Sequence, residues 1–224
     1  MKRILIIAGS LVGLVLTLAL IADTRGKAQS PDSDSRIQLG FANAPVPLDL
    51  KGKNRALVGL GSYLVNVAGD CNACHNPGPG NNQFAPGGNP YQGQPKIINQ
   101  ATYLGGGRNF GPVVPGSSAN IISRNLTPDR TGLPEGGETF AEFLLIMRTG
   151  VDLDQPPLHP TCTGGVINAG CVPPPFDGNL LQVMPWFNFQ NMTDHDLRAI
   201  YEYLSAIPCI AGPSAPSPLH HDCQ

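Results

Sequence analysis

The sequence predicts a mostly helical domain interrupted by long segments rich in Gly and Pro. Two observations support this fold class. Three segments repeat apolar residues with the i, i+3, i+4, i+7 spacing of one helix face, and no two alternating segments are joined by a convincing hairpin turn. The 224 residues are enough for one domain or two small ones.

Each helical pattern carries its own start or stop signal. The first has a face formed by Leu57, Leu60, Gly61, Leu64 and Ala68. The second has a face formed by Phe140, Phe143, Leu144 and Met147, with a Thr139/Glu142 capping box before it and Gly150 as its stop. The third has a face formed by Leu197, Ile200, Tyr201 and Leu204, which begins after the cap Thr193 and ends before Pro208.

The segments between these helices are predicted to be turns and loops. Residues 76–118 and 151–180 are rich in Gly and Pro and show neither helical nor strand periodicity. Residues 29–53 are predicted to form a polar linker that becomes extended, with Pro31, Pro45 and Pro47. Residues 209–224 are predicted to form a Pro-rich tail.

The N-terminal residues 1–28 resemble an export signal. Lys2 and Arg3 precede an apolar run over residues 4–22, and Gly26-Lys27-Ala28 offers a cleavage site for a signal peptide. The run is long enough that an uncleaved N-terminal membrane anchor is the alternative. Either interpretation places the mature domain outside the cytoplasm, in the periplasm of a bacterium. The formal charge of −2 comes with no basic patch that would indicate nucleic acid binding.

The most specific motif is Cys71-Asn72-Ala73-Cys74-His75, which has the C-x-x-C-H form of a covalent c-type haem attachment site. Cys71 and Cys74 would each form a thioether with the haem, and His75 would supply the proximal axial nitrogen to the iron. A chance match or half of a zinc site is the alternative. A common zinc site would need a second ligand pair, and the remaining cysteines form no second C-x-x-C. A thioredoxin-like motif would need a βαβ context.

Four further cysteines suggest disulfides in an exported protein. They allow three pairings, of which the local one is preferred because it would tie down two segments too rich in Gly and Pro to form a core. The predicted pairs are therefore Cys162–Cys171 and Cys209–Cys223. Four free, buried thiols are the alternative.

The second axial ligand largely decides the function, because two strong protein ligands make a closed electron-transfer centre. The candidates are Met147, Met184, Met192, His159, His195, His220 and His221. Met184 is favoured because it lies in an apolar, aromatic loop, residues 181–187, just before the third helix. His159 is the main rival and would give bis-histidine ligation with a lower reduction potential. Met184 could also be a buried residue that only fills space.

Three segments together resemble the class I cytochrome c family, in the bacterial periplasmic branch that includes haem-containing subunits of membrane dehydrogenases. Residues 61–69 lead into the haem motif, and residues 125–129 precede the second helix. Met184-Pro185-Trp186 precedes the third helix. The resemblance implies an all-α, cytochrome c-like helical domain around one covalently bound haem, with the Gly/Pro-rich segments as long loop insertions. It also implies that His75 and Met184 are the axial pair.

The resemblance further implies that the first and last helices cross near the haem edge. Gly59 or Gly61 would allow close approach to Tyr201 or Leu204. Residues 54–208 would then form the mono-haem domain. Arg108, Arg124, Asn125 and Trp186 are candidate hydrogen-bond donors to the haem carboxylates, although each also has an ordinary structural explanation.

The sequence therefore predicts electron transfer by one c-type haem with His75/Met184 ligation, between redox partners such as a dehydrogenase, an oxidase or a quinol-oxidising complex. Such a protein is not itself an enzyme, because it needs no acid–base or nucleophilic residue. The alternative is a cytochrome subunit of a multi-chain dehydrogenase or oxidoreductase complex. A haem sensor or peroxidase-like enzyme is less favoured, because no distal His–Arg pair stands in a recognisable setting.

Overall fold

The computed structural model describes residues 35–78, 83–115, 118–154, 159–212 and 223. The predicted export signal and the two histidines of the tail, His220 and His221, lie outside the described residues. Within the described ranges, no helix is both long and apolar enough to cross a membrane.

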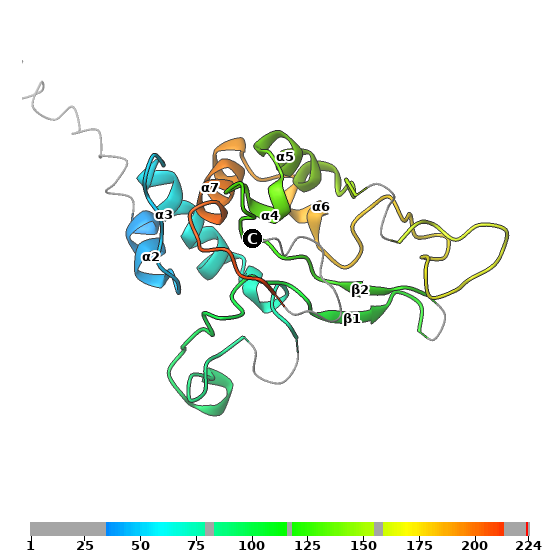
Figure 1. Cartoon of the computed structure of the whole chain (residues 1–224), viewed down its shortest axis with the longest axis horizontal. Helices are drawn as coiled ribbons and strands as arrows, with labels where there is room; N and C mark the ends of the chain where they lie inside the picture. Colours follow the sequence, from blue (N-terminus) through cyan, green and yellow to red (C-terminus); the bar gives the residue numbers. More distant parts are fainter. Residues whose placement is uncertain (1–34, 79–82, 116–117, 155–158, 213–222, 224) are drawn as a thin grey trace, which may run out of the picture. The chain divides into compact units, whose positions relative to one another are not determined.

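Two helices far apart in the sequence cross in direct contact, namely α3 (Arg55–Tyr63) and α7 (Asp194–Leu204) (Figure 1). Gly61 permits the crossing, because a Cβ atom there would lie 1.9 Å from the carbonyl oxygen of Ala199. The predicted crossing of the first and last helical patterns is thus present. The residues of α7 that lie nearest to Gly61 are Ala199 and Tyr203, and not the Tyr201 and Leu204 named from the sequence.

The helix ends follow the predicted local signals. The side chain of Thr139 caps α5 (Phe140–Thr149) in a capping box with Glu142, and Gly150 ends the helix with a φ of 71°. Hydrogen bonds from Thr139 hold the pKa of Glu142 below its usual value. Thr193 caps α7. A cap at Asn54, which accepts hydrogen bonds from two backbone amides, begins α3 and was not predicted.

A buried hydrogen-bond network joins the end of α3 to α7. Helix α3 continues as a single π-helical turn, η2 (Leu64–Ala68), which carries Asn66. The Tyr103 hydroxyl lies 2.5 Å from Asn66 Oδ1 and 2.9 Å from the Tyr203 hydroxyl, and Asn66 Nδ2 donates to Tyr203 at 3.0 Å. Burial raises the pKa of both tyrosines, so both stay protonated donors at neutral pH.

The predicted linker contains a helix. Residues 29–53 include α2 (Ser35–Asn43), which packs against α3. A Cβ atom at Gly40 would lie 1.8 Å from the carbonyl oxygen of Gly59, so the two helices touch backbone to backbone. This helix was not predicted, because its nine residues contain too few apolar positions to show a clear helix face.

Short elements lie between the main helices, two of them within the predicted loop of residues 76–118. They are η3 (Cys71–Ala73), η4 (Pro90–Gln92), β1 (Asn109–Pro112), β2 (Asn120–Ile122), α4 (Pro134–Gly137) and α6 (Trp186–Phe189). Strands β1 and β2 form an antiparallel pair with an irregular register. The sequence did not predict this pair, because strands of four and three residues are too short to show an alternating pattern.

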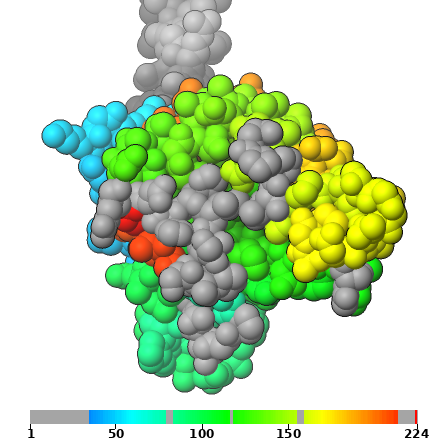
Figure 2. Space-filling model, turned by 45° about the vertical axis from the view of Figure 1, so that its right-hand side comes forward, coloured from blue at the N-terminus to red at the C-terminus, as the bar shows by residue number. Residues whose placement is uncertain are grey.

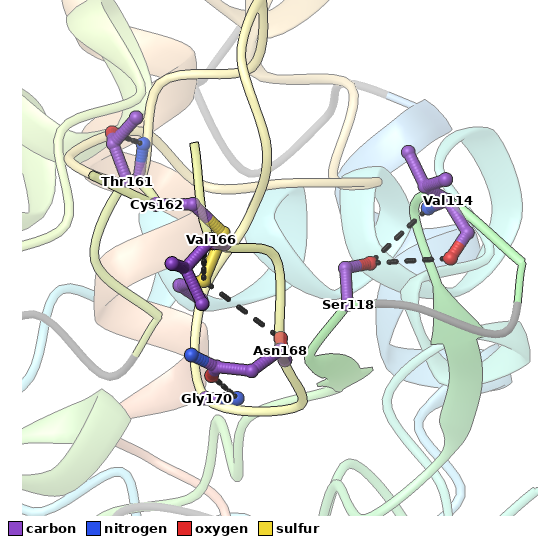
Figure 3. The surroundings of a disulfide bond; sticks show 9 residues. Val114, Ser118, Thr161, Cys162, Val166, Asn168 and Gly170 are labelled. Carbon is purple, nitrogen blue, oxygen red and sulfur yellow. Dashed lines mark hydrogen bonds between the residues drawn. A yellow bond between two sulfur atoms is a disulfide. The ribbon is translucent and has the colours of Figure 1, made fainter. Parts of the chain in front are cut away.

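Both predicted disulfides are present. The S–S distance is 2.00 Å for Cys162–Cys171 and 1.97 Å for Cys209–Cys223. The first closes part of the insertion between α5 and α6, which forms a lobe on the surface (yellow, Figure 2). Figure 3 shows the surroundings of this disulfide. The amide of Ala119 donates to the carbonyl oxygen of Cys171 at 3.0 Å, so the loop is also tied to the residue before β2.

We predict that Gly61→Ala destabilises the protein by about 2 kcal/mol or more, because the added methyl group meets the backbone of Ala199, which cannot move without separating α7 from α3. The measurement is the free energy of unfolding from denaturant titration followed by circular dichroism. Gly170→Ala is the control, since its Cβ atom would meet a side-chain oxygen at 3.2 Å in an exposed loop. Equal stability of the two variants would contradict the close crossing.

Candidate functional site

The C-x-x-C-H motif forms one tight turn directly after η2. Asp70 adopts a left-handed conformation with a φ of 43°, and η3 then begins at Cys71. The amides of Cys74 and His75 both donate to the carbonyl oxygen of Cys71, at 3.2 and 2.9 Å. Cys71, Cys74 and His75 all line one cavity, and neither cysteine is in a disulfide. Burial raises the pKa of the Cys71 thiol to about 12, so it is protonated at neutral pH.

The Gly-rich segment 104–108 holds this turn in place. The buried side chain of Asn72 accepts a hydrogen bond from the Leu104 amide at 2.9 Å. The amide of Gly106 donates to the His75 carbonyl oxygen at 3.2 Å, and Arg108 Nη1 donates to the carbonyl oxygen of Ala73. The segment therefore holds the turn through two backbone amides and the guanidinium of Arg108.

The ring of His75 is oriented by a backbone carbonyl. Its Nδ1 lies 2.8 Å from the carbonyl oxygen of Arg124. A carbonyl oxygen can only accept, so Nδ1 carries the proton and Nε2 keeps its lone pair. Burial lowers the pKa of His75, which favours the neutral ring. This is the tautomer and charge state that a metal-ligating histidine needs.

The cavity is mainly apolar and has a volume of about 310 Å³, within the range of small-molecule and cofactor sites. Its walls combine η2, α5, α7 and the loop before α6. The apolar side chains that line it include Leu64, Val65, Phe143, Met147, Ile200, Leu204, Leu181 and Met184. The structure thus places Met184 in the same cavity as the cysteines and histidine of the motif.

The loop that carries Met184 is fixed at several points. The amide of Leu181 donates to the carbonyl oxygen of Gly150 at 2.7 Å, and the amide of Trp186 donates to that of Met184 at 2.9 Å. The Trp186 ring lies against Gly150, where a Cβ atom would be 2.3 Å from the ring carbons. Val183 is held at a φ of 70°, which is strained for a β-branched residue. Strain of this kind persists where surrounding contacts fix the backbone.

The other candidate axial ligands occupy different settings. Met147 and Met192 also line the cavity, and Met147 is a buried core residue on α5. His159 lines the cavity as well. His195 lies in the first turn of α7, with 68% of its side chain exposed, as expected for a solvated residue.

The candidate donors to haem carboxylates mostly have structural partners. Asn125 is not among the lining residues; its side chain donates to the carbonyl oxygen of Ile210 at 2.6 Å and accepts from Thr127. Trp186 is also absent from the lining and covers Gly150 instead. Arg124 does line the cavity.

Arg124 is bound by two aspartates that the sequence analysis did not single out. Its Nη2 lies 2.6 Å from Asp152 and 2.8 Å from Asp154. Burial alone would lower the pKa of Arg124, but the two carboxylates raise it, and the buried Glu135 adds to their effect. Asp152 and Glu135 also line the cavity. Asp152 stands in a loop and Glu135 in the short element α4, and neither segment shows a periodic pattern, so no sequence signal distinguished them from surface acids.

Comparison with known proteins adds a second line of evidence. The cytochrome c subunit of a quinone-dependent alcohol dehydrogenase from Gluconacetobacter polyoxogenes is 28% identical over 186 residues, which cover 83% of this chain and 25% of the relative. The chain is a distant relative of cytochrome c subunits of dehydrogenases. The gluconate 2-dehydrogenase cytochrome c subunit of Pantoea cypripedii is 28% identical over 151 residues, covering 67% of this chain and 23% of the relative.

The fructose dehydrogenase cytochrome subunit of Gluconobacter japonicus is 25% identical over 189 residues, covering 84% of this chain and 26% of the relative. The chain thus spans about a quarter of the length of these relatives. No family profile and no solved structure matches the chain. The relatives support the predicted haem c and electron-transfer role at the level of the cytochrome c family.

We predict that Asp152→Asn costs about 3 kcal/mol of folding free energy, because it leaves the buried Arg124 with one carboxylate fewer. Denaturant unfolding of the purified protein measures the loss. The matched control is Asp194→Asn, which alters an Arg148 pair of the same 2.6 Å length whose aspartate side chain is 78% exposed. That change should cost less than about 1 kcal/mol. Similar losses in both variants would contradict the structural importance of the buried pair.

Proposed function

We propose that this chain is an exported electron-transfer protein with one covalent c-type haem held in the cavity described above. The observation that carries the proposal is the convergence of Cys71, Cys74, His75 and Met184 on one apolar cavity. The relatives, all cytochrome subunits of dehydrogenases, support it. The helix crossing of α3 and α7 beside this cavity supports a cytochrome c-like fold.

The residues present fit a haem. Cys71 and Cys74 are unpaired thiols at the spacing required for two thioethers. His75 would offer Nε2 to the iron, because the Arg124 carbonyl oxygen accepts the hydrogen bond from Nδ1. Met184 would be the second axial ligand, supplied by a loop that Trp186 and Gly150 fix against α5. When bound, the haem supplies a one-electron ferric/ferrous couple.

The chain itself would tune that couple. With a haem bound, the apolar walls from η2, α5 and α7 would limit its contact with water and favour the less charged state of the iron. Thioether ligation by Met184 acts in the same direction and raises the reduction potential relative to bis-histidine ligation. Attachment of the haem to cysteines is expected outside the cytoplasm, which agrees with the export signal predicted in residues 1–28.

A second candidate function is a cytochrome subunit of a multi-chain dehydrogenase. The relatives favour it, since each is named as the cytochrome subunit of such an enzyme. In that case this chain would accept electrons from a catalytic partner chain. Affinity purification of the full chain from its native host tests this. A dehydrogenase that co-purifies in stoichiometric amount would support the subunit role, and a monomeric haem protein would favour the free carrier.

We predict that Met184→Ala removes the absorption band that marks methionine bound to ferric haem. The substitution should also lower the reduction potential, because the iron loses its thioether ligand. The reduced variant should bind carbon monoxide, whereas the unaltered protein should not. The measurements are oxidised and reduced absorption spectra and a potentiometric titration. The controls are Met147→Leu and Met192→Leu, which alter the other methionines of the cavity wall and should leave the band unchanged.

Retention of the methionine band in Met184→Ala would rule out Met184 as the ligand. Tight carbon monoxide binding to the unaltered reduced protein would instead favour the sensor or peroxidase-like alternative. The mass of the denatured chain provides a separate check. It should exceed the polypeptide mass by one haem, because the chain has one C-x-x-C-H motif.

A further inference from the structure

His159 lines the cavity and has a ring nitrogen for which the described residues supply no hydrogen-bond partner. Its Nε2 is buried and has no hydrogen-bond partner among the described residues. Leaving a buried polar atom without a partner costs about 1–3 kcal/mol. Native structures therefore rarely keep such an atom unless a bound group, an ion or a water completes it. Because His159 lines the cavity, its partner is expected to belong to whatever the cavity binds.

A haem offers a histidine two kinds of polar partner, the iron and the carboxylates. In the proposed function His75 and Met184 occupy both axial positions of the iron. We therefore propose that the Nε2–H group of His159 donates a hydrogen bond to a haem carboxylate. This inference rests on the proposed function. It replaces the rival role of His159 as an axial ligand, and it supplies a carboxylate donor now that Asn125 and Trp186 are found outside the lining.

The carboxylates near His159 make a hydrogen-bond donor necessary for any further carboxylate in this place. Arg124 forms ion pairs with Asp152 and Asp154. It also interacts electrostatically with the buried Glu135, so one cation already faces three carboxylates. The field of this cluster does not favour a further carboxylate, which must therefore be held by direct hydrogen bonds. Burial lowers the pKa of His159, so its ring is neutral at neutral pH and can donate through Nε2.

The disulfide-tied loop holds the backbone of His159 in place. Gly178 packs against it so closely that a Cβ atom there would lie 2.2 Å from the carbonyl oxygen of His159. The Gly178 amide also donates to Thr161 Oγ1 at 2.7 Å. Two residues after His159 the chain pairs with Val172, and Cys162 is then joined to Cys171 (Figure 3). The insertion thus acts as a brace that fixes where His159 enters the cavity.

The test is resonance Raman spectroscopy of the purified haem-loaded protein, reading the bending band of the haem carboxylates, which shifts when a hydrogen bond to them is lost. His159→Phe keeps a ring of similar size but has no donor, and it should shift this band. His159→Gln places an amide nitrogen near the position of Nε2 and should restore the band largely to its original position. Both variants should keep the methionine–iron absorption band of the unaltered protein.

Three results would overturn the inference. An unshifted carboxylate band in His159→Phe would show that no such bond exists. Loss of the original axial-ligand signature in His159→Phe would make His159 an iron ligand instead. An identical shift in His159→Gln and His159→Phe would show that the band reports the loss of the ring and not of a donor. Failure of the proposed function is distinct, because the unaltered protein would then carry no covalent haem.

The brace is tested by the two disulfides, which serve as matched controls. The double variant Cys162→Ala/Cys171→Ala should shift the carboxylate band in the direction seen for His159→Phe, because His159 loses its support. The double variant Cys209→Ala/Cys223→Ala removes a disulfide in the tail and should leave the band in place. Equal effects of the two double variants would contradict the role of the Cys162–Cys171 loop.

Discussion

The close crossing of α3 and α7 is the contact on which the rest of the structure depends. Gly61 lets the two backbones touch, and the Asn66–Tyr103–Tyr203 network then locks η2 to α7. Helix α7 and η2, the turn that continues α3, both supply cavity walls, and the C-x-x-C-H motif begins shortly after η2. The position of the motif relative to α7 is therefore set by a backbone contact and a buried polar network, both of which tolerate little displacement.

Much of this arrangement could be predicted because its signals are local. The capping box of Thr139 and Glu142, the stop at Gly150 and the cap at Thr193 depend on residues a few positions apart, and all are present. The disulfide pairs were also predictable, since short loops are closed most readily in segments with no core of their own. Met184 could be expected at the cavity because its loop is apolar and directly precedes a helix.

The rest was not predictable because it depends on contacts between distant segments without periodicity. Arg124 follows β2, yet its carbonyl oxygen orients His75 and its guanidinium binds Asp152 and Asp154. The segment around each of these residues has the composition of an ordinary surface loop. Helix α2 was not predicted for a related reason. Its packing on α3 relies on the contact between Gly40 and Gly59 rather than on a large apolar face.

The ends of the insertion explain how a long loop can precede the Met184 segment without displacing it. Val151 pairs with Leu180, and the amide of Asp152 donates to the carbonyl oxygen of Asn179 at 2.8 Å. The chain therefore leaves and re-enters the domain at one place beside the end of α5. Because the entropy of closing a loop rises only slowly with its length, the insertion adds little to the cost of holding its ends together. The distance from α5 to Met184 is then set by the few residues after Leu180, whatever the insertion contains.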